Sequence, residues 1–299
     1  MTINPTGMDV FAQPERPGLV FDLDNDVYHS GVNSLSSSAA KVLLGKRPPT
    51  SQDALEFGSL VHTALLEPGK LVVPNFLVLD PNVIGVKQDG TPAASPKSTA
   101  AWKNRVKEAE SEGYTVVSPD EEAGARYGID KALAMADAVR SHKRAAELLA
   151  ACPHREVSAY AEYQPGALVR GRFDLLGDNT IADFKTCLDA SPERFERIAY
   201  DYGYYLQAAV YQFLAEANGI VNDGLHFILC EKDLTPGGNY RVSVLQLDDI
   251  YTIKGRKDFE EALRRWLALG KRVDLPGYSD REVIVGCPDY LIDDEMELI

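Results

Sequence analysis

The chain has 299 residues, a net charge of -14 and an ordinary globular composition, with 45% hydrophobic and 25% charged residues. This length can bury a substantial core, as one large domain or as two small ones. The negative charge argues against a general nucleic-acid coat protein, which is usually basic, but it is compatible with an enzyme that has only a local basic track.

The N-terminal sequence and the lengths of the apolar runs indicate the cellular compartment of the protein. Residues 1–20 are Pro-rich, and we expect them to form a flexible, extended or poorly ordered segment. They lack the basic start and apolar stretch of a secretory signal. No apolar run approaches the ~18–20 residues of a membrane span. We therefore expect a cytoplasmic protein with no membrane partner.

Helical patterns dominate residues 21–150. The stretch "NSLSSSAAKVLLGKRPP" has serines where a helix begins and a Gly-Lys-Arg-Pro-Pro stop, and "SQDALEFGSLVHTALLEPG" ends at Pro68 and Gly69. A loop rich in Gly, Pro, Ser and Lys follows at 84–99. Two further helices are expected at 100–113 and 119–150.

Strand patterns begin after residue 151. "EVSAYAEYQ", "LVRGRFDLL" and "TIADFKT" predict an antiparallel meander with turns at "PGA" and "GDN". A helix is expected at 191–217, then strands "LHFILCEK" and "YRVSVLQL", then a helix at 247–269. This order predicts an α/β fold, with a mixed central sheet flanked by helices and a helical N-terminal half. We expect one domain over 21–299, with a helical part at 21–150 and the sheet core at 151–299.

The hairpin "GRFDLLGDNTIADFKT" places like charges close together. With the turn centred on Asp178 and Asn179, residues whose numbers sum to 357 lie opposite each other. Asp174 then faces Asp183, and Arg172 faces Lys185. Strand alternation puts these four side chains on one face and an apolar set on the other. The apolar set is Phe173, Leu175, Ala182 and Phe184.

Opposed carboxylates destabilise a strand pair unless something compensates. A divalent cation is one answer, because Mg²⁺ prefers oxygen ligands, and the backbone carbonyl of Phe184 would add another oxygen. Lys185 would then stabilise charge that develops on a phosphate. The alternative is a surface hairpin whose charges pair among themselves, with each pair worth only ~0–1 kcal/mol.

Two helices contain further candidates. His62 lies in an apolar helix one turn after Gly58, either as a metal ligand or as a satisfied core histidine. Gln207 and Tyr211 are four residues apart and form a polar stripe beside a core stripe, so both could reach one ligand. The alternative is an exposed Gln and a half-buried Tyr.

For each of the remaining candidate residues, a purely structural role is an alternative to the functional one. Glu156 and Glu162 share a strand, and the register alone does not say which one reaches the site. Arg170 and Arg172 either contact phosphate or balance the aspartates. Three residues open a helix whose N-terminus could hold an anion, and helix capping alone would explain the two serines equally well. These residues are Ser36, Ser38 and Lys41.

The four cysteines show no C-x-x-C spacing. We expect reduced and mostly buried thiols, and neither a structural zinc nor an iron–sulfur cluster. These cysteines are Cys152, Cys187, Cys230 and Cys287.

Five motifs in order resemble one family. "YHSGVNSLSSSAAKVLL", "FGSLVHTALLEP", "RGRFDLL", "IADFKT" and "YLQAAVYQF" are similar to the RecE-type phage and prophage exonucleases (exonuclease VIII), in the RecB-like branch of the PDDEXK nuclease superfamily. The resemblance covers about residue 20 to beyond 215. It implies a PDDEXK core and a Mg²⁺-dependent exodeoxyribonuclease, with Mn²⁺ as a substitute, that degrades linear double-stranded DNA from 5′ ends.

The resemblance also implies site residues. It makes His62, Asp174 and Asp183 metal ligands, and Lys185 a catalytic residue. Gln207 and Tyr211 then help to place the scissile strand. Glu156 matches the acidic position that opens the preceding strand. The Cys cluster of the relatives with an iron–sulfur cofactor is absent from the sequence.

The resemblance implies two kinds of protein partner: a single-strand annealing protein, and further copies of the chain that form a ring around DNA. It also implies a role in phage-type recombination within a bacterial host. Enclosure would help an acidic protein stay on its substrate. Rival hypotheses are a PDDEXK endonuclease, a single-strand nuclease, an inactive DNA-end-binding module and a phage structural protein.

Overall fold

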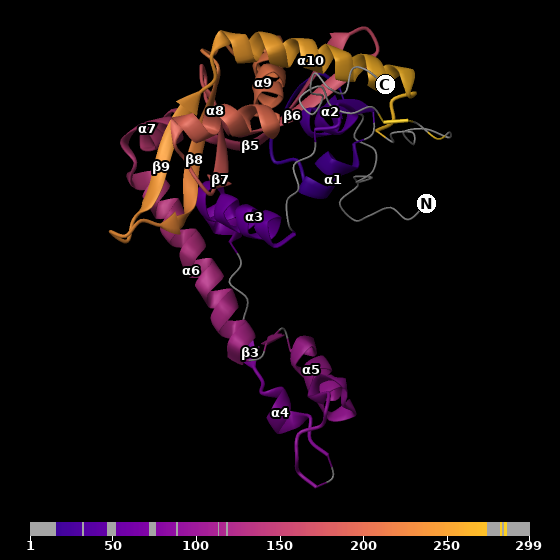
Figure 1. Cartoon of the computed structure of the whole chain (residues 1–299), viewed down its shortest axis with the longest axis vertical. Helices are drawn as coiled ribbons and strands as arrows, with labels where there is room; N and C mark the ends of the chain where they lie inside the picture. Colours follow the sequence, from indigo (N-terminus) through magenta and orange to yellow (C-terminus); the bar gives the residue numbers. More distant parts are fainter. Residues whose placement is uncertain are drawn as a thin grey trace, which may run out of the picture.

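A mixed β-sheet forms the centre of the body in the computed structural model of the chain (Figure 1). The structure describes residues 16–31, 33–46, 52–71, 76–87, 89–112, 114–117, 119–273, 282 and 284–285. Most of the expected N-terminal segment and the acidic C-terminal tail lie outside this part of the chain.

The central sheet has seven described strands, in the order β1-β5-β6-β7-β8-β9, with β2 paired to β6. The β7–β8 and β2–β6 pairs are parallel, and the other neighbours are antiparallel. The strands are β1 (Gly18–Val20), β2 (Ser34–Ser36), β5 (His154–Gln164), β6 (Ala167–Leu176), β7 (Ile181–Cys187), β8 (Leu225–Leu234) and β9 (Tyr240–Gln246). The predicted meander is therefore β5-β6-β7.

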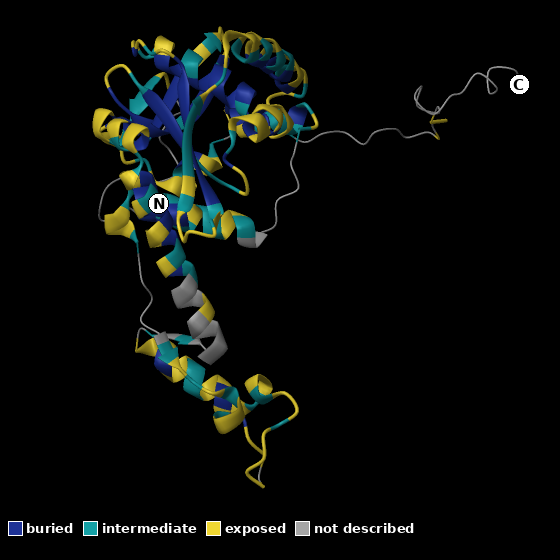
Figure 2. Ribbon diagram, turned by 60° about the vertical axis from the view of Figure 1, so that its left-hand side comes forward, coloured by how far each residue is buried: buried dark blue, intermediate teal, exposed yellow. Residues whose placement is uncertain are grey.

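Helices cover both faces of this sheet, and each face has its own apolar cluster. The first cluster joins α2 (Ser37–Leu43), α8 (Pro192–Asp201), α9 (Tyr204–Ala217) and α10 (Asp249–Ala268) to the sheet. The second joins α3 (Gln52–Leu66), α6 (Pro119–Ser141) and α7 (Lys143–Ala151) to it. Figure 2 shows the central strands of the sheet as largely buried, in contrast to the edge strands β1 and β9.

Two long helices expected from the sequence are each divided in two. The helix expected at 119–150 breaks at His142, whose imidazole Nδ1 accepts a hydrogen bond from the backbone N–H of Ala145 and so caps α7. The helix expected at 191–217 breaks at Gly203, whose φ of 67° is left-handed and suits glycine. This break gives α9 its own direction toward the sheet.

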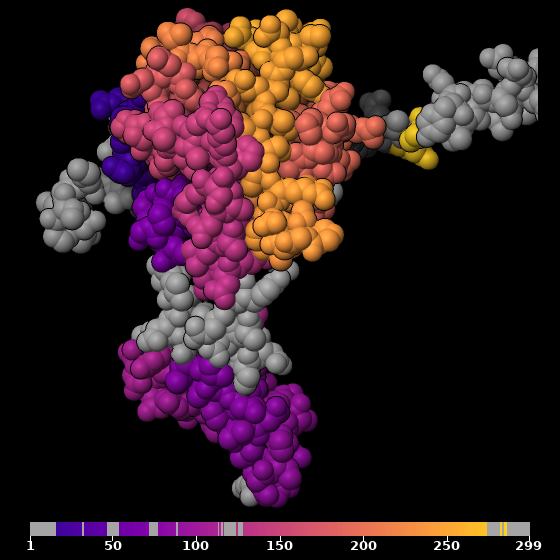
Figure 3. Space-filling view, turned by 90° about the vertical axis from the view of Figure 1, so that its left-hand side faces the viewer, coloured from indigo at the N-terminus to yellow at the C-terminus, as the bar shows by residue number. Residues whose placement is uncertain are grey.

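An arm projects from the body at the far end of α6 (Figures 1 and 3). It consists of β3 (Phe76–Val78), α4 (Pro81–Ile84), the 3₁₀ turn η2 (Pro96–Ser98), α5 (Ala100–Ser111) and β4 (Thr115–Val117). Strands β3 and β4 pair in parallel, and both contact α6. The 23 residues of α6 extend over about 34 Å at ~1.5 Å per residue. The sequence predicted the loop at 84–99 and helix α5, but not a separate arm.

The N-terminal region contains structure that its composition did not predict. Gly18–Val20 forms β1 at the sheet edge, and α1 (Asn25–Ser30) follows it. A single turn, η1 (Pro68–Lys70), follows α3. Among the described residues, no helix is long and apolar enough to cross a membrane.

Candidate active site

Strand β6 changes its neighbour along one edge. Residues 168–170 pair with β2, and residues 175–176 pair with β7. Residues 171–174, between these two stretches, pair with neither strand. The sheet therefore forks at this point, and Asp174 lies at the inner end of the fork.

The hairpin register expected from the sequence is confirmed next to the turn. Leu175 lies opposite Ala182, and Leu176 lies opposite Ile181. The ladder stops before Asp174. There the backbone N–H of Phe184 donates a 2.8 Å hydrogen bond to Asp174 Oδ2, so a carboxylate replaces a strand partner.

Two expectations for this hairpin are wrong. Neither Asp174 with Asp183 nor Arg172 with Lys185 forms a cross-strand pair, because the β6–β7 ladder ends at residue 175. Phe173 and Leu175 do not share a face: Phe173 belongs to the apolar cluster of α9, and Leu175 belongs to that of α3. Strict alternation fails because the pairing of β5 with β6 is interrupted between them.

The interruption is at Glu156. The register that pairs Arg155 with Leu175 and Val157 with Phe173 sets Glu156 opposite Asp174. Glu156 has a left-handed φ of 53°, which costs an L-residue roughly 1–2 kcal/mol. Strain of this kind concentrates at functional sites. Glu156 on β5 and Asp174 on β6 are thus opposed carboxylates in neighbouring strands.

His62 joins these two carboxylates. From α3, its Nδ1 lies 3.1 Å from Glu156 Oε1, and its Nε2 lies 2.9 Å from Asp174 Oδ2. One ligand atom from each of the three residues lies within 4.8 Å of the others. Glu162, the alternative on β5, instead accepts a 3.0 Å hydrogen bond from the backbone N–H of Gly166 in the next turn. Glu156 is therefore the glutamate of this cluster.

Asp183 occupies the other side of the fork and is 1% exposed. Its Oδ1 accepts a 2.7 Å hydrogen bond from Gln207 Nε2 of α9, and its Oδ2 forms an ion pair with Lys185. Oδ1 therefore has a hydrogen-bond donor, whereas Oδ2 is buried and has the ion pair with Lys185 but no hydrogen bond to a described residue. Tyr211, one turn beyond Gln207, is buried and packs edge-on against Phe173 with ring centroids 5.3 Å apart.

The charges at the fork shift one another's pKa values. Burial would lower the pKa of His62, but Asp174 and Glu156 outweigh it and raise that pKa to about 10. Burial would raise the pKa of Asp174, but His62 and Lys185 hold it below its usual value. Burial and the Asp174 carboxylate raise the pKa of Asp183 to about 6, against the opposing effect of Lys185. Lys185 stays charged, because Asp183 and Asp174 raise its pKa above normal despite burial.

This donor set fits a divalent cation. Imidazole nitrogen and carboxylate oxygens are common ligands of such ions, and the three atoms converge in a partly buried site. A cation there would also relieve the repulsion that raises the Asp183 pKa. Phe184 is held beside Asp174 by its own backbone N–H, which keeps its peptide unit close to the cluster.

A tyrosine that the sequence analysis did not single out lies close to two lysine ammonium groups. The Nζ atoms of Lys41 and Lys185 are 5.4 Å and 5.7 Å from the ring centroid of Tyr204. Burial and the Lys185 charge lower the pKa of Lys41 to about 8. Tyr204 precedes Gln207 by three residues on one helix face, and this spacing could have identified it.

The serines at the start of α2 have simpler roles. The hydroxyl of Ser36 caps the helix by accepting a hydrogen bond from the backbone N–H of Ala39, and Ser38 is exposed. Capping accounts for Ser36, and only Lys41 of this predicted group lies beside Lys185.

Arg170 and Arg172 bind the N-terminal segment to the sheet. Arg170 is buried and donates from Nη1 to the carbonyl of Gly31 and the hydroxyl of Ser34. Arg172 donates to Ser158, to Asn25 and to the carbonyl of Leu23. Both guanidinium groups also lie over the ring of Tyr28. These contacts connect both arginines to the segment that precedes α2.

Comparison with known proteins gives one family and a small set of similar structures. A family model described as "PDDEXK-like domain of unknown function (DUF3799)" matches residues 30–282. The crystal structure of an exonuclease candidate from Eubacterium rectale has a TM-score of 0.52 at 15% identity, with 91% of this chain and 97% of that chain covered. An alkaline exonuclease from Laribacter hongkongensis has a TM-score of 0.27 at 12% identity, with 82% and 94% covered. No curated protein matches the chain.

Proposed function

Because the chain belongs to the family of PDDEXK-like domains of unknown function (DUF3799), we propose that it is a Mg²⁺-dependent exonuclease acting on linear double-stranded DNA. Its mixed sheet flanked by helices is the PDDEXK-like fold that its motifs implied. The observation that supports a nuclease best is the convergence of His62, Glu156 and Asp174 at the fork where Asp183 and Lys185 meet.

The proposed ligands of one or two Mg²⁺ ions are side chains from four elements, α3, β5, β6 and β7, and one backbone oxygen. They are His62, Glu156, Asp174, Asp183 and the carbonyl of Phe184. A divalent cation supplies Lewis acidity toward a phosphodiester when it is bound there. Mn²⁺ would serve as a substitute, since it accepts the same oxygen and nitrogen ligands.

The residues of the chain itself have distinct proposed roles. Lys185 is charged and would orient the attacking water and offset negative charge that develops on the phosphoryl oxygens. Gln207 holds Asp183 in place through its hydrogen bond, and with Tyr211 it would position the scissile strand. Lys41, whose ammonium group shares the Tyr204 ring with Lys185, would contact the DNA backbone.

The finer features of the proposal rest on the resemblance of the five motifs to RecE-type exonucleases. They are digestion from 5′ ends, a homo-oligomeric ring, a single-strand annealing partner and a role in phage-type recombination in the cytoplasm of a bacterial host. A ring would compensate for the weak electrostatic attraction between DNA and a chain with a charge of -14.

The decisive experiment compares linear and circular duplex DNA labelled at the 5′ or the 3′ end. Wild-type protein is incubated with Mg²⁺ or with a chelator, beside Lys185→Gln and the control Lys257→Gln, which alters an exposed lysine of α10. We expect cation-dependent release of 5′-terminal nucleotides from linear DNA, unchanged in Lys257→Gln and reduced at least 100-fold in Lys185→Gln. Circular dichroism checks that both variants are folded.

Other outcomes separate the rival functions. Cutting of circular DNA would identify an endonuclease, and digestion of single strands alone would identify a single-strand nuclease. Binding of DNA ends without any cleavage in Mg²⁺ or Mn²⁺ would contradict the enzymatic proposal and identify a binding module.

A further inference from the structure

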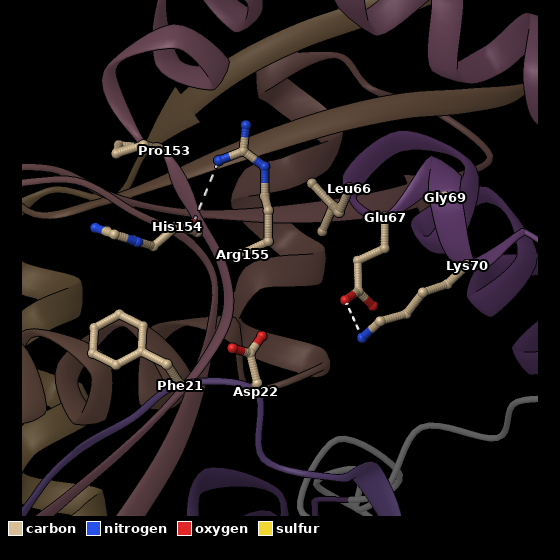
Figure 4. A pocket seen from close by; sticks show the side chains of 9 residues that line it. All are labelled: Phe21, Asp22, Leu66, Glu67, Gly69, Lys70, Pro153, His154 and Arg155. Atoms are coloured by element: carbon tan, nitrogen blue, oxygen red, sulfur yellow. Dashed lines mark hydrogen bonds and ion pairs between the residues drawn. The ribbon is translucent and has the colours of Figure 1, made fainter.

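A cavity of about 400 Å³ adjoins the proposed catalytic centre (Figure 4). It lies between the turn after β1, the end of α3 with η1, and the start of β5. Leu66 in its wall follows His62 by four residues on α3, and Arg155 in its wall directly precedes Glu156. The cavity is therefore next to the His62–Glu156 side of the carboxylate cluster.

One side of the cavity is aromatic. Phe21 is 49% exposed, and its ring meets the imidazole of His154 edge-on, with centroids 5.2 Å apart. Figure 4 shows both rings on the same side. An exposed aromatic ring beside a nuclease centre suits base stacking, which is available to every base because each has a π-face.

The other side is polar and charged. Lys70 forms a 2.5 Å ion pair with Glu67, and the charges of Asp22 and Glu156 also act on its ammonium group. Asp22 has a left-handed φ of 55°, and Figure 4 shows its carboxylate directed into the cavity. This carboxylate accepts no hydrogen bond from a described residue, and its charge acts on Lys70 across the wall. It is thus an acceptor available to a ligand with N–H groups.

The geometry points to a nucleotide as the ligand. We propose that this cavity, the flank pocket, binds one nucleotide of the cleaved strand, with its base stacked on Phe21 and an amino or imino group of that base donating to Asp22. The phosphate of the same nucleotide lies toward Lys70. The volume falls within the ~300–1,000 Å³ of small-ligand sites. The wall contains two acidic residues, Asp22 and Glu67, and two basic residues, Lys70 and Arg155. Because these charges balance, selectivity for a nucleotide would come from stacking on Phe21 and from the Asp22 acceptor.

This inference rests on the proposed nuclease function and is tested in two ways. The first is steady-state kinetics on linear duplex for wild type, Phe21→Leu and Phe21→Trp, with Ile250→Ala as a control at an exposed apolar residue of α10. Phe21→Leu keeps apolar bulk but removes the ring. It should raise KM roughly five- to a hundredfold with little effect on kcat, since base stacking is lost in substrate and transition state alike. Phe21→Trp should restore most of the affinity.

The second test measures binding without cleavage. Linear duplex with 2-aminopurine at each of its three terminal positions is mixed with protein in Ca²⁺, and fluorescence quenching reports stacking on an aromatic ring. We expect quenching at one position that is lost in Phe21→Leu and Asp22→Leu and kept in Ile250→Ala.

The experiments distinguish a failure of the flank-pocket proposal from a failure of the nuclease proposal. If wild type cleaves DNA but Phe21→Leu matches it in both KM and quenching, the flank pocket does not bind a nucleotide. If wild type shows position-specific quenching but cleaves nothing in Mg²⁺ or Mn²⁺, the pocket is supported and the nuclease function is refuted. An equal rise of KM in Phe21→Leu and Ile250→Ala would also overturn the pocket, because it would reflect a general loss of structure.

Discussion

Gln207 donates a 2.7 Å hydrogen bond to Asp183 across the junction of α9 and β7, and both side chains are buried. The second oxygen of Asp183 is paired with Lys185. The amide of Gln207 is thus the hydrogen-bond donor of this buried carboxylate, whose other oxygen has only the ion pair with Lys185.

Gln207→Leu should therefore destabilise the metal-free protein by about 1–3 kcal/mol, because Asp183 Oδ1 would be left buried without a donor. Urea unfolding in a chelator measures this free energy. The matched control is Gln212→Leu on the same helix, which alters a half-buried amide with no side-chain hydrogen bond to a described residue. Equal stability of the two variants would contradict the role given to Gln207.

Metal binding should release a proton from His62. The pKa of its imidazole is raised from 6.5 to about 10 by Asp174 and Glu156, so the metal-free site holds this proton at pH 8. A metal ligand must be neutral imidazole, so each bound ion displaces the proton, and apparent affinity rises with pH up to about 10. Calorimetry with Mn²⁺ in buffers of different ionisation enthalpy counts the protons. His62→Gln should abolish the release, whereas His29→Gln, at an exposed histidine, should not.

The same proton makes metal-free stability depend on pH. Because the folded-state pKa of His62 lies above its unfolded value, its contribution is fully present below pH 6.5 and is lost as pH rises through about 10. Melting temperatures in a chelator should fall across this window for the wild type. A parallel fall in His62→Gln would show that other groups cause it.

The left-handed backbone of Glu156 should lower the stability of the fold, and comparing two variants of this residue should measure the loss. Glu156→Ala and Glu156→Gly both remove the contact with His62, but only glycine adopts a φ of 53° without strain. The glycine variant should be more stable than the alanine variant by about 1–2 kcal/mol, measured by urea unfolding in a chelator. Both should bind Mn²⁺ more weakly than wild type.

Two helical glycines should respond in opposite directions to alanine. A Cβ at Gly255 of α10 would lie 2.4 Å from the backbone oxygen of Tyr205, so Gly255→Ala should force α9 and α10 apart and cost about 1–3 kcal/mol. A Cβ at Gly128 of α6 meets no atom within 4 Å. Gly128→Ala should therefore stabilise by roughly 0.5–1 kcal/mol. Thermal unfolding of both variants checks the contrast.

The sequence predicted the parts of this fold that depend on local pattern. The turn at Asp178 and Asn179 determines the β6–β7 register, and the period-2 strands give the meander. The motif spacing also identified His62, Asp174 and Asp183, which the structure brings to one fork.

What local pattern could not predict depends on long-range contacts. Alternation fails at Glu156 because a left-handed residue opposite Asp174 interrupts the ladder, and a glutamate gives no sign of positive φ in the sequence. The contacts of Arg170 and Arg172 with the N-terminal segment join residues about 140 positions apart. Charge pattern alone could not separate this structural role from a phosphate contact.

Helix α6 gives the arm a mechanical connection to the part of the molecule that contains the His62–Glu156–Asp174 cluster. Near its C-terminal end, Arg140 donates hydrogen bonds to the backbone oxygens of Ala64 and Leu65, which close the last turns of the helix that contains His62. A rod of about 34 Å anchored at one end is a lever. Force applied to its outer tip would act as a torque on α3, one helical turn from the imidazole.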